Sequence, residues 1–321
     1  MKILIVQNKK GIGDLVIYLP YIEAIAKKFA TKIYLLAKEN SKATELMKNN
    51  KNIKEIIILD RDNKNNNGIH DGLAGTFSLI KKIKSYRFDK VFIFNSSLRF
   101  NLIARLSSIK DIFQYPLFAK KNQNITKTAQ NFLKAKLDIN VESNPKIVIS
   151  ENEVEHIKKK YNISGDEKNI LLGIGGSGIT RKMPAKTFLK FMEFCNQKYN
   201  CRFFLATGKN KDDQFILNEI FNSKFKSKCF QLDKLNLSET LPFIKNCNIA
   251  VCNDSSFSHL SAALGLPTIV LMADTPIIYG SYSPQMHPIL PDGVSEVKHN
   301  TLGKDKINPS KIFEKFQSLL N

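Results

Sequence analysis

The sequence predicts an α/β protein made of two doubly wound domains, each built on a parallel β-sheet. Short apolar runs alternate with stretches of helical periodicity along most of the chain, a pattern typical of a parallel sheet with helical crossovers. The alternation restarts after a polar stretch around Pro145, and each half begins with a strand, a glycine turn and a helix. The 321 residues are also enough for two domains of ordinary size.

In the first half, apolar runs that end at polar residues predict the strands, and periodic apolar positions predict the helices between them. Pro20 lies inside the first helical stretch, so we expect a kink or a late helix start there. An Asn-rich loop is expected over residues 63–67. The predicted strands are 2–7, 32–37, 55–59 and 90–95, and the predicted helices are 15–29, 41–49 and 73–84.

The polar stretch 140–152 separates the halves and predicts domains of residues 1–147 and 148–321. We expect the last helix to pack back on the N-terminal domain. The second half has predicted strands at 169–174, 201–206, 229–232, 248–252 and 267–272, and predicted helices at 153–160, 185–199, 212–222, 238–245, 256–264 and 309–320.

The composition is that of a globular protein, with 43% hydrophobic and 24% charged residues. The longest apolar runs are strand-sized, far below the roughly 18 residues of a membrane span. The apolar start of the chain is too short for a signal peptide, so we expect a cytoplasmic protein. Five cysteines, none in a C-x-x-C pair, favour buried reduced thiols over a disulfide or zinc framework.

The formal net charge of +20 comes almost wholly from lysine, since only six of the 49 basic residues are Arg. Lysine, asparagine and isoleucine are all abundant, which indicates compositional drift. Nucleic-acid sites usually use Arg as well, so no nucleic-acid partner is expected. A basic protein would still be attracted to an anionic membrane surface or an acidic glycolipid.

The first candidate site follows the first strand and reads Gly11-Ile12-Gly13-Asp14. Ligands of open parallel sheets bind beyond the carboxyl ends of the strands, and glycines allow a backbone to approach a ligand closely. Asp14 is therefore either a functional carboxylate in a cleft between the domains or a cap of the following helix. The residues alone leave both interpretations open.

The second candidate site is the glycine-rich turn that follows the strand at 169–174. It contains G-x-G-x-x-G, but no acidic residue closes the next strand as in dinucleotide enzymes, and Ile179-Thr180 stands where a phosphate-loop NTPase has Lys-Ser/Thr. Hydroxyls followed by two cations suit a diphosphate; a solvated glycine turn is the alternative. The residues concerned are Gly175, Gly176, Ser177, Thr180, Arg181 and Lys182.

The third candidate site is the turn from the strand at 248–252 into the helix at 256–264, where Ser255 and Ser256 can cap. The free N–H groups of such a helix start bind anions. His259 lies one turn into the helix, where it could donate to a phosphate or sugar oxygen or serve a structural hydrogen bond.

Other candidates look weak. Asp60-Arg61-Asp62 resembles a metal-binding D-x-D motif, but it leads into the Asn-rich loop, so no metal site is expected there. A G-x-S-x-G hydrolase elbow is absent, and five histidines are too sparse for a clustered metal site.

Taken together, the three candidate sites resemble glycosyltransferase family 9, the ADP-heptose:lipopolysaccharide heptosyltransferases. The resemblance covers nearly the whole chain. It rests on the G-D-x-x-x-x-x-P start from Gly13 to Pro20, the central glycine loop with its basic residue and proline, and a long signature from Leu237 to Pro267 that ends N-D-x-x-x-x-H-L-x-A-A-L-G-x-P. The last of these is the most specific.

The resemblance implies a GT-B fold of two facing Rossmann-like domains, with acceptor bound by the first and nucleotide sugar by the second. It implies metal-independent, inverting transfer of a heptose from ADP-heptose to a lipopolysaccharide core or related glycan, with no cofactor besides this co-substrate. Asp14 would be the general base. Donor contacts would come from Gly175, Gly176, Ser177, Thr180, Arg181, Lys182, Thr207, Gly208, Asp254, Ser255, Ser256 and His259, while Gly11 and Gly13 would allow close approach.

Several positions depart from the family pattern. Met183 replaces the usual Trp, Ser255-Ser256 replaces Thr-Gly, and residues 273–276 replace a glycine-rich loop. A different nucleotide sugar and glycan acceptor therefore remain an alternative, followed by a nucleotide-sugar isomerase and a non-catalytic binding protein. Peripheral contact with the inner membrane is also expected.

Overall fold

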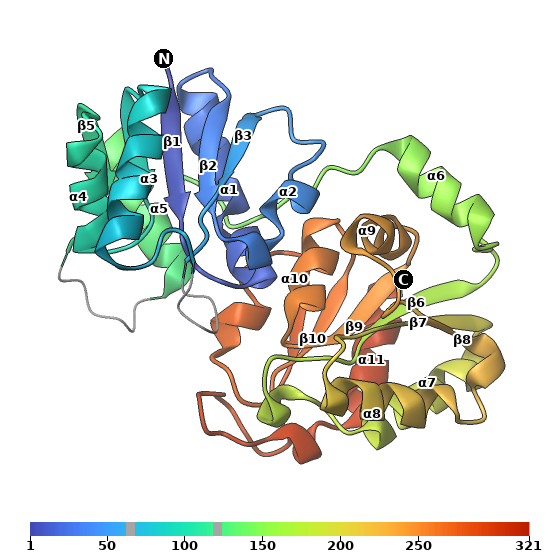
Figure 1. The fold of residues 1–321 in the computed structure, drawn as a ribbon. Helices are drawn as coiled ribbons and strands as arrows, with labels where there is room; N and C mark the ends of the chain where they lie inside the picture. The colour runs from blue at the N-terminus through green and yellow to red at the C-terminus, as the bar shows by residue number, and fades with distance from the viewer. Residues whose placement is uncertain (62–67, 118–123, 321) are drawn as a thin grey trace. The chain divides into compact units, whose positions relative to one another are not determined.

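The computed structural model describes residues 1–61, 68–117 and 124–320 (Figure 1). The chain divides into two compact units, Met1–Pro145 and Lys146–Asn321. The expected boundary, after residue 147, lies close to this division. The Asn-rich loop expected at 63–67 lies outside the described residues.

The first unit is built on a parallel five-stranded sheet in the order β3-β2-β1-β4-β5. Each strand is short and largely apolar, so that both faces can be covered by helices. The strands are β1 (Ile3–Gln7), β2 (Ile33–Ala37), β3 (Ile53–Ile58), β4 (Lys90–Ile93) and β5 (Asp111–Gln114).

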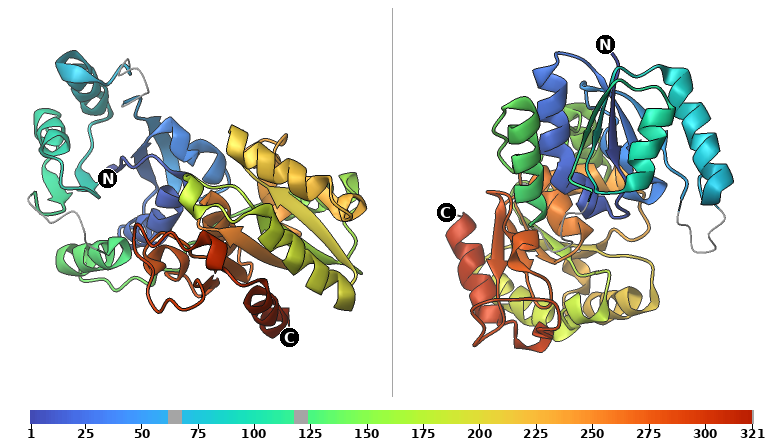
Figure 2. Two further views of the ribbon diagram at one scale, coloured as in Figure 1. Left: turned by 90° about the horizontal axis from the view of Figure 1, so that it is seen from below. Right: turned by 90° about the vertical axis from the view of Figure 1, so that its left-hand side faces the viewer.

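Helices cover both faces of this sheet (Figure 2). Leu79 of α3 and Ile103 of α4 pack with Val6 and Ile93 on one face. On the other face, Phe92 lies 6.5 Å from Phe132 of α5, measured between ring centroids. The helices are α1 (Ile12–Lys28), α2 (Ala43–Leu46), α3 (Gly72–Tyr86), α4 (Leu98–Leu106) and α5 (Ile125–Leu137).

The second unit has a parallel six-stranded sheet in the order β11-β10-β9-β6-β7-β8. One face packs on α7, α8 and α11, and the other includes a contact of 5.7 Å between the rings of Phe204 and Phe243. The strands are β6 (Lys168–Gly173), β7 (Cys201–Ala206), β8 (Cys229–Gln231), β9 (Ile249–Asn253), β10 (Thr268–Leu271) and β11 (Met286–Ile289). The helices are α6 (Glu151–Lys160), α7 (Ala185–Lys198), α8 (Lys211–Phe221), α9 (Leu237–Lys245), α10 (Ser256–Ala263) and α11 (Pro309–Leu320).

The closing helix has its own packing within the second unit. α11 packs on α7, where the rings of Phe316 and Phe191 lie 5.5 Å apart. Ile312 and Phe316 are spaced one turn apart and are completely buried there. This apolar stripe fixes α11 to α7.

Two regions have elements that the sequence left unassigned. Residues 98–137 contain α4, β5 and α5, and residues 286–289 form β11. β11 is an edge strand, where Pro288 is tolerated because one side of the strand needs no partner. All five cysteines are free thiols, and four of them are buried. In the described parts of the chain, no helix is long and apolar enough to span a membrane.

Candidate functional site

Four strands of the second sheet end at the same edge. Gly173 of β6 pairs with Ala206 of β7 and with Cys252 of β9, and Leu271 of β10 pairs with Asn253. The loops that follow these strands therefore start side by side. These loops and the first turn of α10 carry all the residues that the sequence predicted for donor binding, together with residues 272–275 after β10. In parallel sheets this edge is where ligands bind.

Asn253 holds the glycine loop at both ends. Its Nδ2 donates to the carbonyl oxygen of Ile174 at 2.7 Å, and its Oδ1 accepts from the N–H of Met183 at 3.3 Å. The side chain is completely buried. Because the loop leaves at Ile174 and returns at Met183, one amide fixes its entrance and its exit.

Gly175 allows this loop to approach the loop after β7. A Cβ atom at position 175 would lie 2.8 Å from Oγ1 of Thr207 and 2.9 Å from Oδ2 of Asp213. Real Cβ atoms do not come so close, so only glycine fits without a shift. The requirement for Gly175 is thus close packing of two loops.

Lys182 is directed to the start of α8. Its ammonium lies 2.7 Å from Oδ1 of Asp213 and 3.0 Å from Oδ1 of Asn210. Oδ2 of Asp213 in turn accepts from the N–H of Gly208 at 3.1 Å. The pair Lys182–Asp213 therefore links the glycine loop to the β7 loop. A diphosphate would have to compete with these oxygens for Lys182.

Arg181 is the more accessible of the two cations. It is half-buried, and its Nη1 donates to Oγ of Ser177 at 3.3 Å. Thr180 of the same short 3-10 turn hydrogen-bonds to the carboxylate of Asp274 after β10. The hydroxyls and the guanidinium of the loop therefore lie within one ordered turn.

The turn from β9 into α10 begins at Asp254, which is buried, and Ser255, which is the N-cap residue. Ser255 makes no side-chain capping bond, in contrast to the capping expected from the serine pair. Instead Oγ of Ser258 donates to the carbonyl oxygen of Ser255 at 2.7 Å. Ser256 is the first residue of the helix. The N–H groups at this helix start are thus not satisfied by the N-cap hydroxyl.

His259 is held by a residue that the sequence did not single out. Its Nδ1 lies 2.9 Å from Oη of Tyr282, and the two rings stack with centroids 5.6 Å apart. Both side chains are buried. Tyr282 therefore fixes the orientation of the imidazole at the first turn of α10.

The loop after β10 contains an ionised carboxylate in a buried position. Burial alone would raise the pKa of Asp274, but N–H groups of residues 300–302 and the hydroxyl of Thr180 bind the carboxylate and hold the pKa below its ordinary value. The N–H of Leu302 donates to Oδ1 at 2.9 Å. Asp274 thereby joins the glycine loop to the segment before α11.

Three buried hydroxyls at this edge have no hydrogen-bond partner among the described residues. They belong to Thr207 after β7, Ser255 after β9 and Thr275 after β10. Buried polar atoms in native proteins are nearly always paired, so such a cluster indicates a polar ligand or ordered water. The sequence predicted Thr207 and Ser255 but missed Thr275.

The model of glycosyltransferase family 9 (heptosyltransferase) matches residues 76–296, more than half of the chain. The chain belongs to glycosyltransferase family 9. The match includes the glycine loop and the signature from Asn253 to Pro267.

Among known members of glycosyltransferase family 9, the chain is 23% identical over 147 residues to lipopolysaccharide heptosyltransferase 1 of Campylobacter coli, covering 44% of this chain and 43% of the relative. It is 30% identical over 125 residues to lipooligosaccharide heptosyltransferase 2 of Haemophilus influenzae, covering 38% and 33%. These matches span less than half the length of the curated relatives.

The fold of the family is also present over the full chain. The structure of E. coli ADP-heptose lipopolysaccharide heptosyltransferase II has a TM-score of 0.75 with 18% identity, covering 100% of this chain and 98% of that one. Together with the two parallel sheets, this likeness confirms the predicted GT-B class with Rossmann-like domains.

The family's first motif lies in the other unit, at the start of α1. Asp14 is the third residue of the helix, and its Oδ2 accepts from the N–H of Gly11 at 3.3 Å. Lys9 places its ammonium 3.8 Å from Oδ1, and the Asp14 side chain is 31% exposed. Gly13 belongs to the same first turn. Gly11 is the N-cap residue, so Asp14 supports the helix start from the first turn, as the acidic member of a capping box, and keeps an accessible face.

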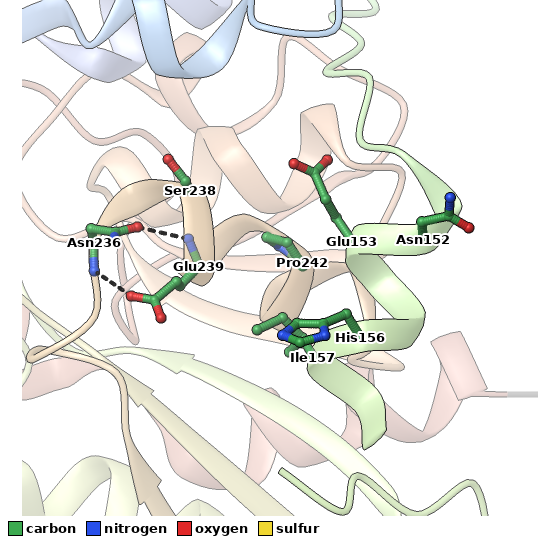
Figure 3. Close-up of a pocket in the computed structure, with 8 residues that line it drawn as sticks. All are labelled: Asn152, Glu153, His156, Ile157, Asn236, Ser238, Glu239 and Pro242. Atoms are coloured by element: carbon green, nitrogen blue, oxygen red, sulfur yellow. Dashed lines mark hydrogen bonds between the residues drawn. The ribbon is translucent and has the colours of Figure 1, made fainter. Parts of the chain in front are cut away.

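The family signature that begins at Leu237 lies at a cavity of about 430 Å³ between α6 and α9 (Figure 3). Asn236 and Glu239 form a capping box there, in which each side chain accepts from the backbone N–H of the other residue. No predicted donor-binding residue lines this cavity. The lining residues are Asn152, Glu153, His156, Ile157, Asn236, Ser238, Glu239 and Pro242.

The D-x-D segment has a structural role where it is described. Oδ2 of Asp60 accepts from the N–H of Ile69 at 3.0 Å, which orders the approach to α3. Asp62 lies outside the described residues. Within residues 1–61, 68–117 and 124–320, no group of three or more His, Cys, Asp or Glu side chains is arranged to hold a metal ion.

Proposed function

We propose that the chain transfers a heptose from ADP-heptose to a lipopolysaccharide core or a related glycan, with inversion at the anomeric carbon and without a metal ion. Family membership and the hydroxyls of Thr207, Ser255 and Thr275 at one sheet edge support this proposal. The hydroxyls are the observation that carries it, since a nucleotide sugar offers oxygens to each of them.

The donor diphosphate is proposed to bind between the glycine loop and the start of α10. Arg181 neutralises the leaving diphosphate with help from Lys182, and Ser177 and Thr180 donate hydrogen bonds. N–H groups of residues 255–259 and the imidazole of His259 bind the phosphates. Gly175 and Gly176 allow the backbone of the glycine loop to approach the diphosphate closely.

The remaining donor contacts are proposed from the positions of residues at the ends of β7 and β9 and at the start of α10. Thr207 and Gly208, at the end of β7, lie by the nucleoside. Asp254, at the end of β9, accepts from hydroxyls of the sugar or ribose. Ser256 contributes a backbone N–H at the first position of α10.

Asp14 is proposed to accept the proton of the acceptor hydroxyl as that oxygen attacks the anomeric carbon. The bond between this carbon and the diphosphate breaks on the opposite face, which gives inversion. The accessible face of Asp14 supports the role. Gly11 and Gly13 leave room for the acceptor beside it.

Another nucleotide sugar is the main alternative. Ser255-Ser256 and residues 273–276 depart from the family pattern at the edge where the sugar would bind. A thermal-shift series with ADP-, GDP-, UDP- and CMP-sugars separates these donors, because a ligand that binds the folded state raises its stability. The proposal predicts the largest shift with ADP-heptose; a larger shift with another nucleotide would reassign the donor.

Nucleotide-sugar isomerase and non-catalytic binding are the remaining rivals. Incubation of ADP-heptose with the protein and no acceptor should leave the sugar nucleotide unchanged under the proposal, whereas an isomerase would convert it. A binding protein would release no ADP with any acceptor.

The contribution of the buried hydroxyls to ADP binding can be tested by substitution. Thr207→Val and Ser255→Ala remove groups without a protein partner, so the melting temperature should hold while ADP affinity falls by roughly tenfold for each. Thr268→Val is the matched control, because its buried Oγ1 already donates to the carbonyl oxygen of Leu266 at 2.9 Å. It should lose stability and keep ADP affinity. Unchanged affinity in both site variants would remove this edge from the donor site.

The protein is proposed to act in the cytoplasm, with peripheral contact to the inner membrane surface. The net charge of +20 supports this contact, since anionic headgroups attract basic proteins. No nucleic-acid partner is proposed.

A further inference from the structure

Two neighbouring helices of the first unit carry large apolar side chains on their outer face. Leu73 and Phe77 of α3 are 82% and 68% exposed, and Ile69 just before the helix is 66% exposed. Leu98, Leu102 and Leu106 of α4 are 58%, 47% and 56% exposed. Both sets are spaced by four residues, so each forms a stripe along one side of its helix. We call these six side chains the α3–α4 surface.

This surface is the outside of a well-packed layer. The inner sides of the same helices are buried against the sheet through Leu79, Ile83 and Phe100. Oγ of Ser107, after α4, donates to the carbonyl oxygen of Ile80 of α3 at 3.3 Å, and the guanidinium of Arg99 donates to the carbonyl oxygen of His70. The two helices lie side by side in both views (Figures 1 and 2). The exposed stripes therefore lie on two helices that are packed against each other.

The charged side chains within the two helices are all positive, and the acidic N-cap of α3, Asp71, is paired with Arg61 at 3.7 Å. The two helices contain five basic side chains and neither Asp nor Glu: Lys81, Lys82, Lys84, Arg99 and Arg105. Two copies of this surface would place like charges opposite each other in a symmetric dimer, which opposes self-association. Anionic lipid offers both an apolar interior for the leucines and phenylalanine and negative headgroups for the cations.

We propose that the α3–α4 surface is the membrane-binding face of the protein and that its partner is an anionic phospholipid surface. Leu73, Phe77 and Leu102 enter the boundary between headgroups and acyl chains, and the basic side chains contact the headgroups. The inference deepens the proposed function, because the membrane contact proposed there needs a face of the protein to make it.

Sedimentation with vesicles tests the apolar part. The full chain should bind vesicles of equal parts phosphatidylglycerol and phosphatidylcholine, and bind phosphatidylcholine vesicles at least about tenfold more weakly. The double variant Phe77→Ser/Leu102→Ser should lose about tenfold or more of the binding to the anionic vesicles. Phe215→Ser is the matched control, since Phe215 of α8 is 65% exposed and lies in the second unit. It should bind as the wild type does.

The electrostatic part has its own pair of variants. Lys81→Gln/Lys84→Gln should weaken vesicle binding and reduce its dependence on salt. Lys158→Gln/Lys159→Gln removes the same charge from exposed positions of α6 and should change little. Equal losses in the two pairs would show that net charge, and no particular face, drives binding, which would overturn the proposal.

Two further outcomes would also overturn it. One is unchanged vesicle binding by Phe77→Ser/Leu102→Ser. The other is a wild-type dimer in sedimentation velocity that this variant converts to a monomer, since the partner would then be a second copy. Vesicle binding needs no turnover, so it is independent of the proposed transferase activity. With a lipid-free glycan acceptor, the double variant should turn over as the wild type does.

Discussion

The ammonium of Lys182 lies 2.7 Å from Oδ1 of Asp213, and the two side chains are only 5% and 3% exposed. This ion pair joins the glycine loop to the start of α8 within the candidate donor site. Asp213 also accepts from the N–H of Gly208. Asp213 therefore both neutralises Lys182 and holds the loop after β7, so the stability of the site depends on both members of the ion pair.

Removing one partner of this pair should be costly. Lys182→Met leaves Asp213 as a buried charge without its cation, so we expect a loss of about 3–5 kcal/mol in the free energy of unfolding. Lys182→Met/Asp213→Asn should recover much of that loss, because no buried charge remains. Denaturant unfolding of the single and double variants measures the coupling. Additive losses would show that the two side chains do not act as a pair.

Asn253 should act as a positioning residue for donor binding. Asn253→Ala leaves the carbonyl oxygen of Ile174 and the N–H of Met183 without their partner, which should loosen the glycine loop and weaken ADP binding by roughly tenfold or more. Asn248 is the matched control at the opposite end of β9, where its Oδ1 accepts from the N–H of Asn169 at 2.8 Å.

Calorimetry with ADP separates the two asparagines. Asn248→Ala should lose stability with little change in ADP affinity, whereas Asn253→Ala should lose both. Asn253→Asp keeps the acceptor for Met183 but loses the donor to Ile174, so it should restore only part of the affinity. Equal ADP affinity in both alanine variants would contradict the positioning role.

The lowered pKa of Asp274 predicts how the stability of the second unit depends on pH. Its pKa lies below the ordinary value of 3.8, because the lowering hydrogen bonds outweigh the raising effect of burial. A carboxyl group with a lowered folded-state pKa stabilises the fold above its unfolded pKa, and this contribution is lost as pH falls through the folded value. The loss should therefore occur below about pH 4.

Melting temperatures against pH test this expectation. Asp274→Asn should lower the melting temperature at neutral pH and flatten its fall below about pH 4. Asp138→Asn is the control, since Asp138 pairs with Lys134 on the surface with 85% of its side chain exposed. Exposed pairs contribute little to stability. An Asp274→Asn curve parallel to the wild-type curve at all pH values would show that this carboxylate is not linked to folding.

The sequence predicted the strands that carry the site because buried parallel strands are continuous apolar runs that end at polar turns. β6, β7 and β9 were found in this way, and the glycine loop and the α10 start followed from their positions. In contrast, α4 was missed because Leu98, Leu102 and Leu106 face outward while Phe100 and Ile103 face inward. With apolar residues on both sides, no helical stripe is visible.

The missed site residues have partners far away in the sequence. Tyr282 meets His259 across 23 positions, and Asn253 reaches Ile174 across 79. Neither contact has a local signature. Asn253 did offer one signal, since it is a polar residue at the end of the apolar strand β9. Thr275 offered none of its own, because a threonine in a loop is ordinarily solvated, although residues 273–276 depart from the family pattern. The sequence also offered no sign that Lys182, which was assigned to the diphosphate, forms an ion pair with Asp213, because the two residues are distant along the chain.

The rate of ADP release from ADP-heptose in the presence of a glycan acceptor tests the proposed role of Asp14 as general base most directly. Asp14→Asn is the variant of choice, because the amide oxygen of Asn can still accept the hydrogen bond from the N–H of Gly11 but does not accept the proton. The variant should keep its melting temperature and its ADP affinity, and its turnover should fall by roughly 10²–10⁴-fold. A variant that retains more than about a tenth of wild-type turnover would contradict the role of Asp14 as general base and leave it as a member of the capping box only.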